Sequence, residues 1–335
     1  MQEPLFWMNS PNRPGVFARL LTPLAVVAGR LTKRRLAQGP WHRIGVPVIC
    51  VGNINIGGTG KTPTVIALAM RLKDMGYSPH VVSRGYGGSL EGPVRVRERT
   101  HKAAQVGDEP LLISAFCETW VSKDRHAGAL EAQKAGADVI LLDDGFQNPT
   151  LAKDLSIVVV DAVSGFGNGM VFPAGGLRET PKDGLARADI VLVIGHPKAR
   201  NQFVALWPDV GMLPVVHAEL KPLDTGMEWK GHKFLAFAGI GRPEKFFATL
   251  RGLGADLIQT EALSDHQPLT RRLLNRMEAD AFFNGAQMVT TEKDATRVPE
   301  DFKLKVLTLP VRLQLEDWAP IDDALAGVGL IPKSA

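Results

Sequence analysis

A glycine-rich segment that directly follows an apolar run constrains this chain more than any other feature. Residues 46–52 (Val-Pro-Val-Ile-Cys-Val-Gly) predict a buried strand, and residues 64–75 predict a helix because apolar side chains recur there at helical spacing. Between them, residues 55–62 read Asn-Ile-Gly-Gly-Thr-Gly-Lys-Thr. A strand, a glycine-rich turn and a helix in this order predict a phosphate-binding loop, or P-loop. The alternative is a glycine-rich turn with an incidental lysine, since the strict pattern starts with Gly where this chain has Asn55.

Each residue type in the segment has a physical reason to be there. Glycines let backbone N–H groups approach phosphates closely, and the helix that follows adds the positive end of its dipole. Lys61 is placed to reach the terminal phosphates, and the hydroxyl of Thr62 is a ligand for Mg²⁺. The predicted nucleotide contacts in this segment are Asn55, Ile56, Gly57, Gly58, Thr59, Gly60, Lys61 and Thr62.

The remaining pattern predicts an α/β protein with two domains. A chain of 335 residues that is 45% hydrophobic is long enough for two cores. Continuous apolar runs at 80–83, 139–143, 156–161 and 190–194 alternate with helical patterns such as 109–116 and 128–135, which predicts a P-loop-type, doubly wound, mostly parallel sheet. Strand patterns at 234–239, 257–258, 287–291 and 306–309, with a helix at 243–253, predict a second, smaller α/β domain. We expect an N-terminal segment at 1–43, a kinase-like core at 44–224 and the smaller domain at 225–335, with the boundary in the polar stretch 220–231.

The N-terminal segment is strongly basic and contains one short apolar run. It carries a single acid, Glu3, against seven cations: Arg13, Arg19, Arg30, Lys33, Arg34, Arg35 and Arg43. The uncharged run 20–29 is too short to span a bilayer, which needs about 20 residues. Two interpretations stay open. The segment is either an amphipathic helix on an anionic membrane surface or a helix packed on its own domain with a solvated basic end. No nucleic-acid-binding motif accompanies it.

Two adjacent acids end one of the predicted strands. Asp143 and Asp144 follow the apolar run 139–142 and precede Gly145. In P-loop proteins an Asp at such a position holds Mg²⁺. Side chains of successive strand residues point to opposite faces, so one acid can face the metal and the other a structural or substrate group. The alternative is a simple Asp-Gly turn.

Several further segments carry polar residues in loops. Arg84 lies in the glycine-rich loop 83–88 and can meet a phosphate or be solvated. Asp108 and Glu109 enter a predicted helix, where they either cap it or accept a hydroxyl proton. Arg178 follows a long glycine-rich loop, where an arginine can stabilise transferring phosphate. In the second domain His266 and the charged segment 290–294 have either a structural or a ligand-facing role.

Taken together and in this order, these motifs make the chain similar to the tetraacyldisaccharide 4′-kinases, the lipid A 4′-kinases of Gram-negative bacteria. The resemblance covers nearly the whole chain. It rests on 51–53 with 57–63, on 83–87, 107–110, 123–125 and 143–147, on 173–175 with 177–179, on 238–240 with Pro243 and 246–247, and on Asp265, His266 and 290–294.

The resemblance implies a kinase that transfers the γ-phosphate of ATP to the 4′-hydroxyl of a tetraacylated glucosamine disaccharide 1-phosphate, at the cytoplasmic face of the bacterial inner membrane. It implies ATP and Mg²⁺ as cofactors, an acylated lipid substrate and an anionic membrane surface as partners, and no nucleic-acid or protein partner. Implied catalytic residues are Asp108, His266, Lys61 and Arg178; implied metal ligands are Thr62, Asp143, Asp144 and Glu179. Implied substrate contacts are Arg84, Tyr86, Glu109, Arg125 and Gln147, and further nucleotide contacts are Glu292, Lys293 and Asp294. With a lipid substrate to reach, the basic N-terminus becomes the preferred docking element.

Two other classes of protein compete with a kinase. A P-loop GTPase or ATPase of the metallochaperone type needs Cys or His clusters for its cargo, and Cys50 and Cys117 are isolated in apolar sequence. A non-catalytic nucleotide-binding adaptor at the membrane transfers no phosphate and tolerates loss of Asp108.

Overall fold

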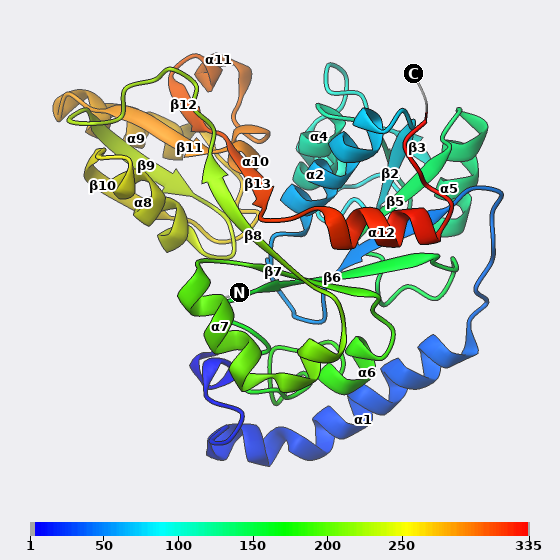
Figure 1. The fold of residues 1–335 in the computed structure, drawn as a ribbon. Helices are drawn as coiled ribbons and strands as arrows, with labels where there is room; N and C mark the ends of the chain where they lie inside the picture. Colours follow the sequence, from blue (N-terminus) through cyan, green and yellow to red (C-terminus); the bar gives the residue numbers. More distant parts are fainter. Residues whose placement is uncertain (1–3, 334–335) are drawn as a thin grey trace.

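The computed structural model describes residues 4–333 and contains two β-sheets with helices around them (Figure 1). The strands of the larger sheet are β1 (Val48–Gly52), β2 (Pro79–Ser83), β3 (Val94–Arg95), β4 (Glu118–Val121), β5 (Val139–Asp143), β6 (Leu155–Asp161), β7 (Ile190–Ile194), β8 (Val215–Pro222) and β13 (Val311–Leu315). The strands of the smaller sheet are β9 (Lys233–Ala238), β10 (Asp256–Ala262), β11 (Gln287–Thr291) and β12 (Val306–Leu309).

The helices connect these strands. The α-helices are α1 (Val16–Gln38), α2 (Lys61–Asp74), α3 (Ala103–Val106), α4 (Asp108–Ser114), α5 (Arg125–Lys134), α6 (Pro181–Leu185), α7 (Pro197–Leu206), α8 (Pro243–Gly252), α9 (Arg271–Phe283), α10 (Glu292–Ala295), α11 (Glu300–Lys303) and α12 (Ala319–Gly327). Two 3₁₀ helices are η1 (Leu5–Met8) and η2 (Pro208–Met212).

The larger sheet has the strand order β13-β8-β7-β6-β1-β5-β2-β4-β3 and is parallel except at its two edges. Its central strand β1 pairs with β5 on one side and β6 on the other. All five residues of β1 are buried, which explains its continuous apolar sequence. Alternate residues face two cores: Ile49 and Val51 pack with α2 and α12, while Val48 and Cys50 pack with α5 and α6. The predicted doubly wound, mostly parallel fold is confirmed.

The predicted helix after the P-loop begins earlier than its apolar pattern suggested. It was expected from Thr64 and starts at Lys61. Gly60 precedes it with a left-handed backbone (φ 98°), a conformation that glycine adopts without steric cost. The polar first turn carries no hydrophobic periodicity, which is why the pattern missed it.

The smaller sheet has the order β10-β9-β11-β12, and its neighbouring strands pair in parallel. Its core lies on both faces, with Phe237 and Leu274 on one side and Phe234 and Phe247 on the other. Strand β10 extends beyond the predicted 257–258. Its residues are half-buried or exposed and none is fully buried, so the sequence carries no continuous apolar run that would reveal its full length.

The smaller domain was predicted to span residues 225–335, but in the structure the chain after residue 310 belongs to the larger domain. Strand β13 returns to the larger sheet, where it pairs antiparallel with β8. Helix α12 then buries Ile321 and Leu325 in the core of the larger domain. The smaller domain is therefore an insertion between β8 and β13, residues 223–310. β13 was missed because an edge strand of five residues carries only a short alternation.

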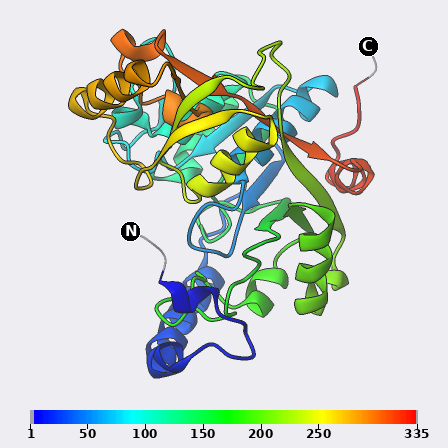
Figure 2. The same ribbon diagram turned by 90° about the vertical axis from the view of Figure 1, so that its left-hand side faces the viewer.

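The predicted amphipathic N-terminal helix is present as α1, which is longer than its apolar run and contains Pro23. Small residues on one face, including Ala25 and Ala28, pack against Val171 and Ala174. Figures 1 and 2 both show α1 at the end of the molecule opposite the smaller domain. Among residues 4–333, no helix has both the length and the apolar character that crossing a membrane requires.

The return of the chain to the larger domain makes a prediction about stability. Leu325 is fully buried in the larger core, so Leu325→Ala should lower the free energy of unfolding by about 2–5 kcal/mol in urea titrations. Leu304→Ala, at a fully exposed position, is the control and should change it by less than about 0.5 kcal/mol. Equal effects of the two changes would contradict the placement of α12.

Candidate active site

The P-loop connects β1 to α2, and side chains fix its shape. The Asn53 side-chain amide donates to the Gly57 carbonyl at 3.2 Å and to Thr59 Oγ1 at 3.1 Å. Asn55 donates through Nδ2 to the carbonyl of Gly165 at 2.9 Å. The residue that replaces the first glycine of the strict pattern therefore anchors the P-loop to the long glycine-rich loop that precedes Arg178.

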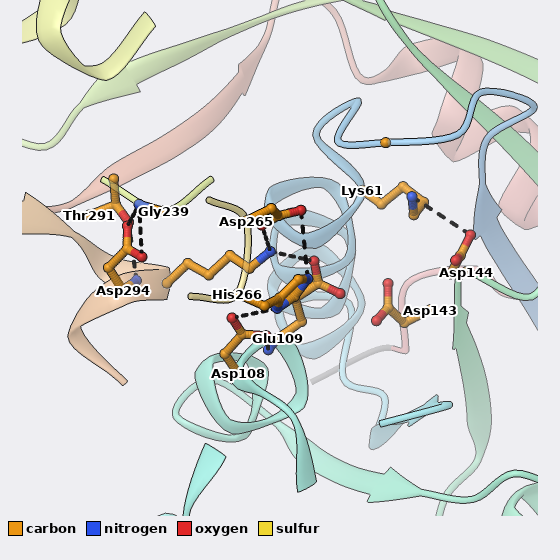
Figure 3. Close-up of polar contacts among 12 residues, drawn as sticks. Lys61, Asp108, Glu109, Asp143, Asp144, Gly239, Asp265, His266, Thr291 and Asp294 are labelled. Carbon is orange, nitrogen blue, oxygen red and sulfur yellow. Dashed lines mark hydrogen bonds and ion pairs between the residues drawn. The ribbon is translucent and has the colours of Figure 1, made fainter. Parts of the chain in front are cut away.

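Lys61 lies within a network of charges at the edge where β1 and β5 end (Figure 3). Its Nζ is 3.6 Å from Asp144 Oδ1. Arg178 pairs with Asp144 through both guanidinium nitrogens at 2.8 and 3.1 Å, and also donates to Gln147 Oε1 at 3.1 Å. Burial opposes the ionisation of Asp144, but the charges of Lys61 and Arg178 outweigh it and lower the pKa of Asp144 to about 2. Asp144 thus holds two cations ready for an anion.

Asp143 differs from its neighbour in having a free oxygen. Its Oδ2 accepts from the Ser83 hydroxyl at 2.9 Å, while its buried Oδ1 has no hydrogen-bond partner within residues 4–333. Burial, with the nearby Glu109 and Asp144 charges, raises the pKa of Asp143. An orphaned carboxylate oxygen is costly unless a cation or water meets it, so Asp143 fits the predicted Mg²⁺ site.

No set of three or more acidic, His or Cys side chains in residues 4–333 converges into a ready-made metal site. Proteins usually bind Mg²⁺ through one or two carboxylates together with phosphate oxygens, an arrangement that needs no such set. Thr62 follows Lys61 in the first turn of α2, and Asp143 supplies the open carboxylate oxygen. These two residues fit Mg²⁺, whereas both oxygens of Asp144 accept from Arg178, so its predicted role as a metal ligand stays a prediction.

Glu179 is engaged differently from a free metal ligand. Both of its oxygens accept from Arg187 Nη2, at 2.6 and 2.5 Å. Gln147 Nε2 also donates to Glu179 Oε1 at 2.9 Å and to the Asn53 carbonyl at 2.8 Å. In this arrangement Glu179 orients Gln147, which in turn contacts Arg178. Its predicted role as a direct metal ligand stays a prediction, and a metal ion bound there would compete with Arg187 for the carboxylate oxygens.

The structure brings together Asp108 from the larger domain and His266 from the smaller domain (Figure 3). The distance from His266 Nδ1 to Asp108 Oδ2 is 3.0 Å. Asp108 is almost fully buried at the first position of α4. His266 has a left-handed backbone (φ 58°), which is strained for a residue with a side chain and points to a constrained turn. The Tyr86 ring lies 5.3 Å from the His266 ring, between centroids.

Close backbone packing places Asp108. Gly107 has φ 90°, and a methyl group there would lie 2.8 Å from the Tyr86 carbonyl oxygen. The loop that carries Tyr86 therefore crosses directly against the start of α4, which only glycine permits. Burial raises the pKa of Asp108, but the His266 hydrogen bond and the charge of Lys293 outweigh it, so the net pKa is lowered. The same hydrogen bond raises the pKa of His266. An ionised carboxylate and a protonated imidazole are therefore favoured as a pair.

The predicted nucleotide-side residues of 292–294 have protein partners in this structure. Lys293 Nζ lies 3.1 Å from Glu109 Oε1 and 3.4 Å from Asp265 Oδ1, so it bridges the two domains. Asp294 accepts from the Gly239 amide and from the Thr291 hydroxyl. Glu292 accepts from the amide of Val311 and from Arg312. Their direct contact with nucleotide stays a prediction.

Two of the predicted substrate contacts differ in exposure. Arg84 is exposed beside the site, as a ligand-facing cation must be. Arg125 is buried at the first position of α5, and its Nη1 donates to the Ser122 carbonyl at 2.7 Å. Within the described residues its Nε has no hydrogen-bond partner. Arg125 therefore supports the floor of the site, and its substrate contact stays a prediction.

Some residues of the site were not singled out from the sequence. Ser83 and Arg187 hold Asp143 and Glu179, and both are ordinary in their sequence context. On the side facing the P-loop, Lys245 and Arg242 of the smaller domain pair with Asp161 at the end of β6. Asp161 could have been found from its position in the sequence, because it ends a buried strand. Its strand β6 pairs with one side of β1, and β5, which ends at Asp143, pairs with the other side.

The glycine at the start of α2 gives a testable prediction. A methyl group on Gly60 would lie 2.5 Å from Ile194 Cδ1, at a φ of 98°. Gly60→Ala should displace the P-loop at a cost of about 1–3 kcal/mol, and weaken the affinity for Mg²⁺-ATP roughly 5- to 150-fold in equilibrium titrations. Gly252→Ala, where a methyl group meets no atom within 4 Å, is the matched control and should leave the affinity unchanged. An unaltered affinity of Gly60→Ala would contradict this view of the loop.

The chain is similar to known proteins along almost its whole length. Residues 17–328 match the family model described as tetraacyldisaccharide-1-P 4′-kinase. The chain is 59% identical over 326 residues to the tetraacyldisaccharide 4′-kinase of Dinoroseobacter shibae, covering 97% of each chain. It is 58% identical to that of Jannaschia sp., covering 97% of this chain and 98% of the relative.

A solved structure shares the fold along almost the whole length. The crystal structure of LpxK from Aquifex aeolicus in complex with ATP matches with a TM-score of 0.75 and 26% identity, and the match covers 93% of this chain and 99% of that one. The family model and the relatives named above each cover most of the chain. The chain belongs to the tetraacyldisaccharide 4′-kinase family.

Proposed function

We propose that this chain transfers the γ-phosphoryl group of ATP to the 4′-hydroxyl of a tetraacylated glucosamine disaccharide 1-phosphate, in the biosynthesis of lipid A. Full-length relatives at 59% and 58% identity carry the name of this activity. The observation that carries the mechanism is the contact between Asp108 and His266, which joins the two domains at the same site as the P-loop lysine. The adaptor and metallochaperone alternatives give no reason for such a pair.

The acceptor hydroxyl needs a base. A sugar hydroxyl is a weak nucleophile at neutral pH, and a carboxylate within hydrogen-bond reach accepts its proton as the bond to phosphorus forms. Asp108 takes that proton, the new bond joins the 4′-oxygen to the γ-phosphorus, and the bond from the γ-phosphorus to the bridging oxygen of ADP breaks. His266 orients Asp108 and keeps it ionised, because its hydrogen bond favours the charged carboxylate.

The donor side neutralises the phosphate charge. Lys61 and Arg178 are already held together by Asp144, so they meet the phosphates without reorganisation. Thr62 and Asp143 would hold Mg²⁺, with Asp144 adjacent, and the ion supplies further charge neutralisation when bound. Glu179 acts on this side through Gln147, which it orients toward Arg178. Arg84, Tyr86 and Glu109 are the proposed contacts with the acceptor.

Removal of the base tests this mechanism. Asp108→Asn should lower kcat by about 10²–10⁴, in a reaction of ATP, Mg²⁺ and the acylated disaccharide 1-phosphate in detergent micelles. The product to detect is the 1,4′-bisphosphate, and ATP affinity should change little because the P-loop is untouched. Asp256→Asn, at an exposed position on the smaller domain, is the control and should turn over normally. Near wild-type turnover of Asp108→Asn would exclude Asp108 as the base and favour the adaptor reading.

We also propose that α1 docks the protein on the anionic surface of the membrane. Five large apolar side chains of α1 stand exposed at three- and four-residue spacing, so they share one face of the helix and form an apolar stripe. The stripe consists of Phe17, Leu20, Leu24, Val27 and Leu31. Exposed apolar area of this kind on an α-helix marks an interaction surface.

The charges beside the apolar stripe suit a lipid surface. Arg19, Arg30 and Arg34 are exposed on the same helix, and each basic residue near an anionic membrane contributes about 1 kcal/mol. Apolar insertion and basic attraction together give the two signals that stable but reversible anchoring needs. Since ATP is a cytoplasmic phosphate donor, the proposed location is the cytoplasmic face of the inner membrane, with the protein held peripherally.

The apolar stripe can be tested with lipid vesicles. Burying a leucine stabilises by at least about 1.5 kcal/mol, so the double variant Leu20→Glu with Leu24→Glu should lose roughly a hundredfold in partitioning to vesicles that contain anionic phosphatidylglycerol. The wild type should bind neutral phosphatidylcholine vesicles less well, and raised salt should weaken its binding to the anionic ones. Phe282→Glu, an exposed apolar residue on the smaller domain, is the control. Equal loss in Phe282→Glu would contradict docking through α1.

A further inference from the structure

The guanidinium of Arg297 contacts three segments of the smaller domain and lies beside the carboxylate of Asp108. Arg297 follows α10 by two residues and is almost fully buried. Its Nη1 donates to the Gln267 carbonyl at 2.8 Å, and its Nη2 donates to the Gly239 carbonyl at 3.2 Å and to Asp294. Its Nε lies 3.6 Å from Asp108 Oδ2 and finds no hydrogen-bond acceptor among the described residues. The one unsatisfied nitrogen of Arg297 therefore faces the carboxylate of the proposed base.

The contact with Gln267 fixes the turn that presents His266. The left-handed backbone of His266 is costly by itself, so neighbouring contacts must hold it. Gln267 comes directly after His266, and its carbonyl is clamped by Arg297. A second clamp is the hydrogen bond from the Ser264 amide to Gln267 Oε1, at 3.0 Å. Arg297 thus ties one end of the strained turn to the body of the smaller domain.

Asp294 is the fixed point for Arg297. It is completely buried, and it accepts from the Gly239 amide at 3.1 Å and from Thr291 Oγ1 at 2.6 Å. A buried carboxylate requires a counter-charge, and Arg297 supplies it. The guanidinium is therefore held in one orientation in the smaller domain, and its free Nε edge projects toward the larger domain. A lysine could not make this set of contacts, because a single ammonium cannot span acceptors that lie on different sides of a planar fork.

We propose that Arg297 is a positioning residue for phosphoryl transfer: it holds the His266 turn and places a fixed positive charge beside Asp108 when the two domains meet. This rests on the proposed role of Asp108 as base. Arg297 does not touch the reacting atoms and acts through Asp108 and His266. Because Arg297 belongs to the smaller domain, the contact between the two domains brings both its charge and the His266 ring to Asp108.

The charge of Arg297 acts on Asp108 together with its other neighbours. His266 and Arg297 pair with Asp108 directly, and Lys293 acts on it through its charge. The acids around these cations are Asp265, which pairs with His266 and Lys293, and Glu109, which pairs with Lys293. The cations lower the pKa of Asp108 against the effect of burial. Removal of one cation should therefore raise the pKa of Asp108, and the acid limb of the pH profile should move to higher pH.

The test is the pH dependence of kcat/KM for the lipid acceptor in two variants. Arg297→Met should lower kcat about 10- to 100-fold, a part of the ~10²–10⁴ that a general base supplies, and move the acid limb to higher pH. Arg297→Lys should restore the acid limb toward its wild-type position, because the charge is kept, but should recover only part of kcat because the fork is lost. The affinity for Mg²⁺-ATP should stay within about threefold of the wild type in both, as the P-loop is not involved.

The controls separate positioning from stability and from the proposed function itself. Arg276→Met removes an exposed arginine–carboxylate pair of the smaller domain, 2.9 Å from Glu261, and should change neither kcat nor the pH profile. A lower Tm of Arg297→Met with an unshifted acid limb in the folded fraction would overturn the inference, as would wild-type kcat in Arg297→Lys. If Asp108→Asn itself retains turnover, the proposed base is wrong. If Asp108→Asn is inactive and the acid limb of the Arg297→Met profile is unshifted, the proposed base stands and only the proposed role of Arg297 is wrong.

Discussion

The carboxylate of Asp144 is the interaction on which the donor side of the site depends. It lies at the end of β5, next to the P-loop strand, and holds Lys61 and Arg178 at one place before any phosphate arrives. Two cations brought together without an anion between them would repel each other, so a buried acid is needed to keep them there. The neighbouring Asp143 is ordered by Ser83 and keeps one oxygen open. The two adjacent acids thus have different roles: Asp143 is the last residue of β5, and Asp144 follows it with a left-handed backbone (φ 53°), so their side chains meet different partners.

The smaller domain contacts the larger one on both sides of this centre. His266 and Lys293 meet Asp108 and Glu109 on the acceptor side, and Lys245 meets Asp161 on the P-loop side. The chain enters this domain after β8 and leaves it before β13, and these two strands are paired neighbours. Both connections therefore run side by side, as in a hinge, and Figure 1 shows them crossing together between the sheets. A rotation there would make or break both sets of contacts at once, which is how closure can exclude water and complete the site.

Much of this architecture follows from the sequence because its signals are local. The buried strands of both sheets are continuous apolar runs, and the P-loop is marked by glycines and a lysine within eight residues. What escaped prediction is non-local. β13 is a short edge strand whose partner lies about ninety residues earlier in the chain. Arg297 can be recognised only from its three hydrogen-bond acceptors, which lie on separate segments, and from the Asp108 carboxylate beside it. Glu179 was expected near the metal because of its motif. In the structure it pairs with Arg187, a partner that no spacing rule identifies.

Helix α1, the proposed docking element, is joined by a hydrogen bond to a loop of the active site. The C-terminal end of the helix is joined to the loop that carries Gln147: Arg35 donates to the Gln147 carbonyl at 3.3 Å, and the Trp41 amide to the Pro149 carbonyl at 2.9 Å. Near the same end, Lys33 pairs with Asp183 at 2.6 Å. The proposed docking surface and the P-loop therefore belong to the larger domain, whereas His266 belongs to the smaller domain inserted between β8 and β13. With α1 as the proposed docking element, a movement of the smaller domain would leave the apolar stripe in place, because α1 packs on Val171 and Ala174 of the larger domain.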